Sequence, residues 1–222
     1  MRDRAAVFFT LFFSYAYFFG GSGFNQNATF DLTRALVERR EIHIDAYAGN
    51  TADVSFHDGH TYSNKAPGLA FLAAVPYAVF HAIHGAPRDA IELNVALYLC
   101  TVFVCGVSGA LIGVLLFGAA RERGLSASAA MGIALLTGLG TPLFAYSTML
   151  FAHVPAALLV LVAFLNLRKR PMLAGAAIGA ATLVNYLCAP LVILFLINVG
   201  RGFSPPPPGA GDAAHPRGGR AA

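Results

Sequence analysis

A succession of apolar runs separated by short polar segments constrains this chain more than any other feature. The runs occupy residues 5–21, 68–83, 91–120, 125–150, 154–167 and 172–199. A helix that spans a bilayer needs about 20 mostly apolar residues. Charged residues make up 12% of the chain, roughly half of the share that is usual in soluble domains. We therefore predict an integral membrane protein.

The lengths of the runs predict an all-α, polytopic fold with about six transmembrane helices. The last run is broken at Asn185-Tyr186, so we expect two short helices that turn near Asn185. The predicted transmembrane domain covers residues 1–200, with a long outer loop at about residues 22–90. Residues 201–222 are rich in proline, glycine and alanine, and this composition predicts a disordered tail.

The positions of the basic residues decide the predicted topology. If residues 68–83 lie on the membrane surface instead of crossing the membrane, ten of the fifteen basic residues lie on the same side of the membrane as the N-terminus. Cytoplasmic segments carry an excess of Lys and Arg, so we predict a cytoplasmic N-terminus and an extracytoplasmic loop in the plasma (inner) membrane. The basic clusters thus indicate topology, and we expect the bilayer, not nucleic acid, as the partner.

The outer loop contains the polar residues that could carry chemistry. Residues 28–40 have helical hydrophobic spacing and predict an amphipathic surface helix, whereas residues 41–56 indicate loop or extended chain. A second surface helix is expected at residues 68–83. Between the two surface helices lies the densest polar cluster, which runs from Ser55 to Gly68 with the sequence SFHDGHTYSNKAPG.

Lys65 is the first candidate in this cluster. It directly precedes the predicted surface helix, with Pro67 near the first turn. A lysine beside a helix N-terminus is a suitable phosphate site. The alternative is that Lys65 binds no phosphate and simply extends its charged end to the membrane interface.

Four histidine and aspartate residues are candidates for metal binding or proton transfer. His57, Asp58 and His60 could bind a divalent metal ion, or could simply form a polar turn around Gly59. His153 stands at the outer end of a predicted span, where a titratable group tends to face a cavity, or could sit at the level of the headgroups. Asn185 and Tyr186 form a polar break that could be only a helix turn.

The segment Tyr62-Ser63-Asn64-Lys65-Ala66-Pro67-Gly68 resembles a motif of the GT-C glycosyltransferases. In these enzymes an aromatic residue and [DNE]-K-x-P-[GP] stand before a surface helix, after one span and an amphipathic helix. The resemblance is to the branch that contains the lipid A aminoarabinose transferase and the protein O-mannosyltransferases. It covers about residues 5–200 and corresponds to the N-terminal part of a typical member, so a truncated or diverged relative is also considered.

The resemblance implies a donor, a reaction and roles for individual residues. The donor would be a polyprenyl-phosphate-linked sugar, which an acceptor attacks at the outer face of the membrane. Lys65, Asn64 and Tyr62 would contact this donor. Asn185 and Tyr186 stand where the family has a basic residue that contacts the lipid phosphate.

The acidic side of the family pattern is altered. Asn25 and Gln26 stand where the family has its Asp-Glu pair, so the resemblance assigns Asn25 to substrate binding. An amide cannot accept the proton that a general base must take. The catalytic candidates are therefore Asp31, which is the nearest carboxylate, and His153, which stands where family members often carry a second acid.

Three functions are compatible with these features. The first is a GT-C-like glycosyltransferase. The second is a membrane component without catalytic activity that binds a polyprenyl lipid or a partner protein, which the altered acidic pair favours. The third is a transporter or channel, which the scarcity of polar residues within the spans disfavours. The sequence leaves open whether the protein uses a divalent metal cofactor.

Overall fold

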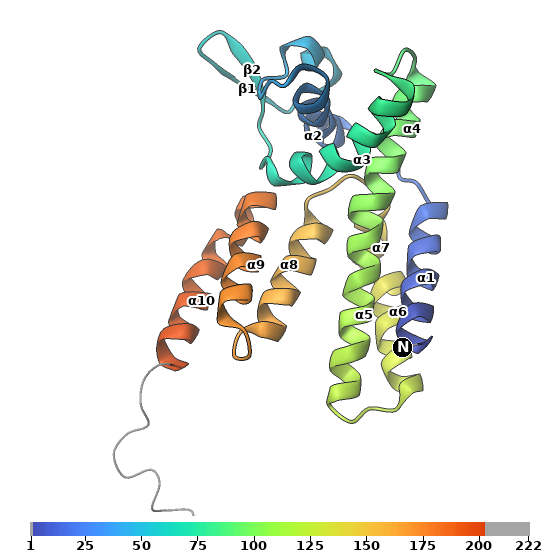
Figure 1. The fold of residues 1–222 in the computed structure, drawn as a ribbon, viewed down its shortest axis with the longest axis vertical. Coiled ribbons are helices and arrows are strands. Elements are labelled where there is room, and N and C mark those ends of the chain that lie inside the picture. Colours follow the sequence, from blue (N-terminus) through green and yellow to red (C-terminus); the bar gives the residue numbers. More distant parts are fainter. Residues whose placement is uncertain (1, 203–222) are drawn as a thin grey trace, which may run out of the picture.

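The computed structural model describes residues 2–202, and the chain is mostly helical (Figure 1). The α-helices are α1 (Arg2–Tyr17), α2 (Phe24–Arg34), α3 (Gly68–His84), α4 (Ala90–Cys100), α5 (Val107–Glu122), α6 (Ala127–Gly140), α7 (Pro142–Ser147), α8 (His153–Asn166), α9 (Pro171–Val184) and α10 (Ala189–Gly202). Short π turns (Ala35–Arg39, Thr101–Gly106) and 3-10 turns (Asp45–Asn50, Tyr186–Cys188) join some of them. The predicted all-α class is confirmed. The tail predicted at residues 201–222 lies, from residue 203 on, outside the described residues.

A small β-hairpin is the exception to the helical fold. Strands β1 (Val54–His57) and β2 (His60–Ser63) pair antiparallel, with His57 opposite His60. Asp58 and Gly59 have φ of 48° and 79°, which is the left-handed backbone that a two-residue hairpin turn requires. The loop or extended chain predicted at residues 41–56 is thus partly a strand, and the polar turn around Gly59 is confirmed.

One helix in residues 2–202 is both long and apolar enough to cross a membrane. It comprises α4, the π turn and α5, and runs for 33 residues from Ala90 to Glu122. The other apolar helices, including α3, α6, α8 and α9, have 10–17 residues. In Figure 1, helices α1, α5, α6, α8, α9 and α10 lie roughly side by side, and α2, α3 and the hairpin lie together at one end.

Close packing around α1 builds the first part of the helical body. Leu11 and Tyr15 of α1 are fully buried against α5 and α6. Gly113 and Gly138 face them, and a side chain at either glycine would collide with Leu11. Small residues allow such close approach of apolar helices. The Tyr15 hydroxyl donates to the Gly138 carbonyl at 3.0 Å, which satisfies its buried polar atom.

Helices α8, α9 and α10 form the second part of the body. The predicted turn near Asn185 is confirmed, because α9 ends at Val184 and α10 begins at Ala189. The Asn185 Oδ1 accepts a hydrogen bond from the Leu187 amide at 3.1 Å, which stabilises the turn. Ile178 and Phe195 pack in a shared cluster and hold α10 along α9.

Glu38 connects the loop elements at the end of the helical body. Its carboxylate accepts hydrogen bonds from the Arg34 guanidinium at 2.8 Å, from the Tyr47 hydroxyl at 2.9 Å and from the Tyr77 hydroxyl. These groups come from α2, the first 3-10 turn and α3. Burial raises the pKa of Glu38, but the hydrogen bonds from Arg34 and Tyr77 overcome this effect, so the pKa is lowered. The ionised carboxylate therefore stabilises the loop in its observed arrangement.

Candidate functional site

A cavity of about 300 Å³ opens where α3 and α8 begin and α9 ends. The sequence singled out eight catalytic or donor-binding residues, and six of them line this one cavity. They are Asn25, Asn64, Lys65, His153, Asn185 and Tyr186. They come from four separate segments of the chain, and we therefore take this space, called the Lys65 cavity below, as the candidate site.

Gly68 holds two walls of the Lys65 cavity together. A Cβ atom at this position would lie 2.6 Å from the Leu183 carbonyl oxygen and 2.7 Å from the Val184 nitrogen. Real Cβ atoms essentially never approach backbone this closely, so only glycine fits without a shift. The contact places the start of α3 directly against the end of α9. Lys65 and Asn185 therefore face the same space.

Lys65 is half-buried and has a carboxylate partner. Its Nζ lies 3.0 Å from the Asp53 Oδ2, just before strand β1. Asp53 does not line the cavity, and no other Asp or Glu of residues 2–202 does. The cavity wall therefore carries a cation that is neutralised from outside the cavity.

Two helix N-termini add positive potential to the Lys65 cavity. Helix α3 begins at Gly68 and α8 begins at His153, and residues of both first turns line the space. Neither start has a side-chain cap or an acidic residue in its first turn within the described chain. The free backbone N–H groups of a helix start attract anions. The electrostatics thus favour an anionic ligand.

His153 is exposed and oriented by its neighbours. Its Nδ1 lies 3.4 Å from the Asn185 amide nitrogen, which fits an imidazole that carries its proton on Nε2. The ring is stacked on Phe151 at 5.5 Å and meets the edge of Tyr146 at 4.7 Å. An imidazole with its proton on Nε2 can accept a further proton only at Nδ1, so His153 could act as a base only where a ligand takes the place of the Asn185 amide.

Asp31 does not line the Lys65 cavity. The structure therefore does not bring the predicted acid, Asp31, and the predicted phosphate-binding residue, Lys65, into one site. Thr29 faces the Lys65 cavity, and Asp31, two residues later on α2, faces a smaller cavity of about 120 Å³. Residues two apart on a helix point about 200° away from each other. The predicted acid and the predicted phosphate-binding lysine are therefore separated by α2.

The environment of Asp31 disfavours the charged form of its carboxyl. The side chain is 2% exposed, and its Oδ1 accepts from the Asn50 amide at 3.1 Å. The Oδ2 is buried with no hydrogen-bond partner among residues 2–202. Burial raises the pKa of Asp31 to about 6, against the smaller opposing effects of Asn50 and Arg34.

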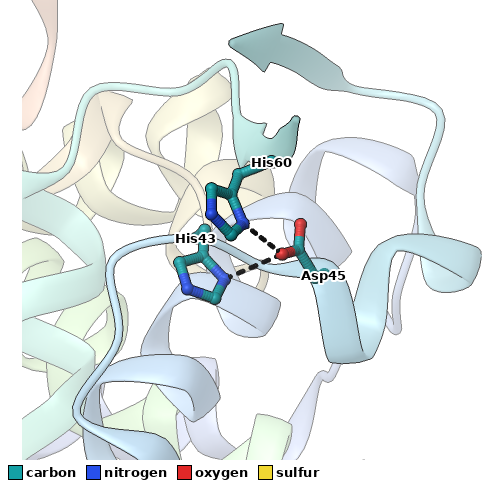
Figure 2. A group of neighbouring side chains, drawn as sticks. All are labelled: His43, Asp45 and His60. Carbon is teal, nitrogen blue, oxygen red and sulfur yellow. Dashed lines mark hydrogen bonds and ion pairs between the residues drawn. The ribbon is translucent and has the colours of Figure 1, made fainter. Parts of the chain in front are cut away.

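The predicted metal residues do not form one cluster. His57 and Asp58 lie on the exposed hairpin turn, where the His57 Nε2 is 3.2 Å from the Asp58 Oδ2. His60 instead contacts Asp45 and His43 (Figure 2). The hairpin pairs His57 with His60, but His60 is held by Asp45 and His43 of the preceding segment, whereas His57 contacts only the turn residue Asp58 among these candidates. Tyr62 also belongs to this region, with its ring 6.5 Å from that of His43, and does not line the Lys65 cavity.

His43, Asp45 and the Glu38 network were not predicted from the sequence. The spacing His43-x-Asp45 is a possible signal, because alternate residues of an extended segment share one side. The third residue of this cluster, His60, is 15 residues beyond Asp45 in the sequence. It lies close to Asp45 only because the chain forms the hairpin.

No family model, no curated protein and no solved structure matches this chain.

Proposed function

We propose that this chain is a GT-C-like membrane glycosyltransferase that uses a polyprenyl-phosphate-linked sugar at the extracytoplasmic face. The observation that carries the proposal is the convergence of Lys65, His153 and Asn185 on one cavity with two uncapped helix N-termini. Lys65 and the backbone amides of α3 and α8 would bind the donor phosphate. Asn25, Asn64 and Tyr186 would contact the polar part of the donor.

The proposed membrane arrangement has six spans: α1, α4–α5, α6–α7, α8, α9 and α10. Large apolar side chains exposed on these helices, such as Phe13, Leu136 and Ile193, would face lipid. A helix of 14 residues is about 21 Å long, which is shorter than the hydrocarbon layer of about 30 Å. The bilayer would therefore thin locally around α8 and α9.

Charges at the end opposite the loop support the proposed orientation. Arg4 packs against Gly118 of α5, and the Lys169 Nζ lies 3.9 Å from the Glu122 Oε2. Basic residues of the N-terminus, the α5–α6 connection and the α8–α9 connection thus lie at one end. Positive residues concentrate on the cytoplasmic side, so the Lys65 cavity would face the other compartment.

The two catalytic candidates have different access to the proposed donor. His153 lines the Lys65 cavity and would accept the proton of the acceptor hydroxyl or amine at Nδ1, after the acceptor has displaced the Asn185 amide. Asp31 would act only on a group that reaches the smaller cavity behind α2. We expect His153→Gln to lower sugar transfer more than Asp31→Asn, measured with radiolabelled donor. A larger loss in Asp31→Asn would assign the base to Asp31, and equal losses would overturn the assignment of His153 as the base.

A second candidate function is a binding component without catalytic activity. The amide of Asn25, not a carboxylate, lines the Lys65 cavity, and an amide cannot act as a general base. Such a protein would bind the polyprenyl lipid, or a partner protein, and transfer nothing. Lipid binding by Lys65 with no transfer to any acceptor would favour this function.

The test is photocrosslinking of a polyprenyl phosphate probe to the full chain purified in detergent. Lys65→Ala should remove most of the crosslinking, because it removes the cation of the cavity. Lys169→Ala is the matched control, since Lys65 and Lys169 are the two lysines of the chain and Lys169 lies at the opposite end. Crosslinking that is absent, or equal in both variants, would overturn the proposal.

A further inference from the structure

Two imidazoles and a carboxylate meet beside the β-hairpin (Figure 2). The Asp45 Oδ2 lies 2.6 Å from the His60 Nδ1 and 3.1 Å from the His43 Nδ1. The two rings are stacked with centroids 4.4 Å apart, and Figure 2 shows both Nδ1 atoms directed at the same oxygen. All three ligand atoms lie within 4.8 Å of one another.

We propose that His43, Asp45 and His60 bind one zinc ion. Imidazole nitrogen and carboxylate oxygen are the ligands of three-residue zinc sites, in which a fourth position is left for water or another group. The site lies outside the Lys65 cavity, since none of the three residues lines that cavity. It is therefore a second site, independent of the proposed glycosyltransferase activity.

The distances fit zinc after a small movement of side chains. Two ligands of a tetrahedral zinc at about 2.0–2.1 Å are roughly 3.4 Å apart. The separation between His43 and Asp45 is already close to this value. The separation between His60 and Asp45 would have to open by about 0.8 Å, and both of these side chains are exposed enough to move.

Three further observations favour a metal over a simple ion pair. The His43 Nδ1 is buried and has no hydrogen bond of good geometry among residues 2–202, although it points at Asp45. The Asp45 Oδ1 accepts from the Thr61 amide at 2.6 Å, an outer contact of the kind that orients metal-binding carboxylates. The Glu41 Oε2 lies 3.8 Å from the His43 Nδ1 and would provide the fourth ligand if it left the Arg39 Nε, from which it accepts at 2.7 Å.

The zinc ion would connect segments that otherwise have little to stabilise them. Phe56 of β1 is largely exposed, and a two-stranded hairpin is marginally stable in water by itself. A metal joining residues 43–45 to β2 would contribute its binding free energy to the order of this loop. We therefore assign the site a structural role in holding the hairpin.

The proposal is tested with the full chain in detergent, stripped with a chelator and titrated with Zn²⁺ in a calorimeter. We expect one zinc ion per chain, and affinity lowered by more than about 100-fold in His43→Ala and His60→Ala, since loss of an outer contact alone costs 10–100-fold. His57→Ala is the matched control, because His57 is on the same hairpin but outside the cluster. It should bind zinc as the unchanged chain does.

X-ray absorption at the zinc edge tests the proposal without any variant. The zinc-loaded chain should show two imidazole ligands at about 2.0 Å. This measurement decides the question even if His43→Ala or His60→Ala does not fold. Absence of stoichiometric zinc, fewer than two imidazoles, or an equal loss in His57→Ala would overturn the proposal. Crosslinking of polyprenyl phosphate, measured separately, tests the proposed function and should be unchanged in His57→Ala.

Discussion

The two cavities on either side of α2 have opposite chemistry. The Lys65 cavity has a cation, two helix N-termini and no carboxylate on its described wall. The smaller cavity has a buried carboxyl, Asp31, whose Oδ2 has no partner in the described chain. Thr29 and Asp31, which mark the two sides, are only two residues apart. One helix therefore separates a region suited to an anion from a region that disfavours one.

This comparison teaches that nearness in sequence and membership of one site are different properties. Asp31 is the nearest carboxylate to the position where the family resemblance places an acid. Its direction, however, depends on helical phase, and α2 points it away from Lys65.

The largest expected effect is that of Gly68→Val, which should destroy the Lys65 cavity. The new side chain would collide with the backbone of Leu183 and Val184, and such overpacking costs about 3 kcal/mol of unfolding free energy. Thermal unfolding in detergent measures this loss. Gly132→Ala in α6 is the control, because a Cβ there meets no atom within 4 Å. Equal stability of the two variants would show that α3 and α9 do not meet as described.

At neutral pH, Asp31→Asn should raise the free energy of unfolding by about as much as Gly68→Val lowers it. The folded pKa of about 6 lies above the ordinary value, so the folded state favours the neutral carboxyl. Stability of the unchanged chain should therefore be highest below about pH 4, fall as the pH rises to about 6, and stay level above it. The total fall is about 3 kcal/mol, at 1.36 kcal/mol for each pKa unit.

Asparagine at position 31 removes the titrating group and should remove this pH dependence. The measurement is chemical unfolding of both proteins between pH 4 and pH 8. If the two curves stay parallel across that range, the carboxyl of Asp31 is not buried in the way described.

Glu38→Gln should have a smaller and opposite effect. Glu38 is only partly buried, in contrast to Asp31, and accepts from three groups, so its folded pKa is lowered. Its stabilisation is therefore present above the ordinary pKa of about 4.3 and is lost as the pH falls through the folded pKa. Hydrogen bonds to charged groups contribute about 1.5–3 kcal/mol, so we expect a loss of about 2 kcal/mol at pH 7. A variant as stable as the unchanged chain would contradict the network.

The fold was largely predictable from the sequence, and the site only in part. Apolar runs and the break at Asn185 are local signals, so the helices and the turn between α9 and α10 were predicted. The family resemblance assigned roles in one site to Lys65, His153 and Asn185, and these three residues do line one cavity. The side of α2 on which Asp31 lies, and the pairing of His60 with Asp45, depend on helical phase and on a hairpin that brings distant residues together. Neither can be derived from spacing alone.

Asp53→Asn should have the smallest effect, and it tests the charge of the Lys65 cavity directly. Asp53 neutralises Lys65 from outside the cavity, with 3.0 Å between Nζ and Oδ2. A partly exposed ion pair contributes up to about 1 kcal/mol, so releasing Lys65 should raise the affinity for a phosphate probe by up to about fivefold. The measurement is a titration of polyprenyl phosphate crosslinking.

Asp58→Asn is the matched control, because Asp58 lies on the hairpin turn and contacts His57 instead. In the double variant Lys65→Ala/Asp53→Asn the gain should vanish, since the released cation is then absent. A gain that persists without Lys65 would mean that Asp53 repels the phosphate by itself. The anion would then be attracted by the helix N-termini of α3 and α8, and not by the lysine.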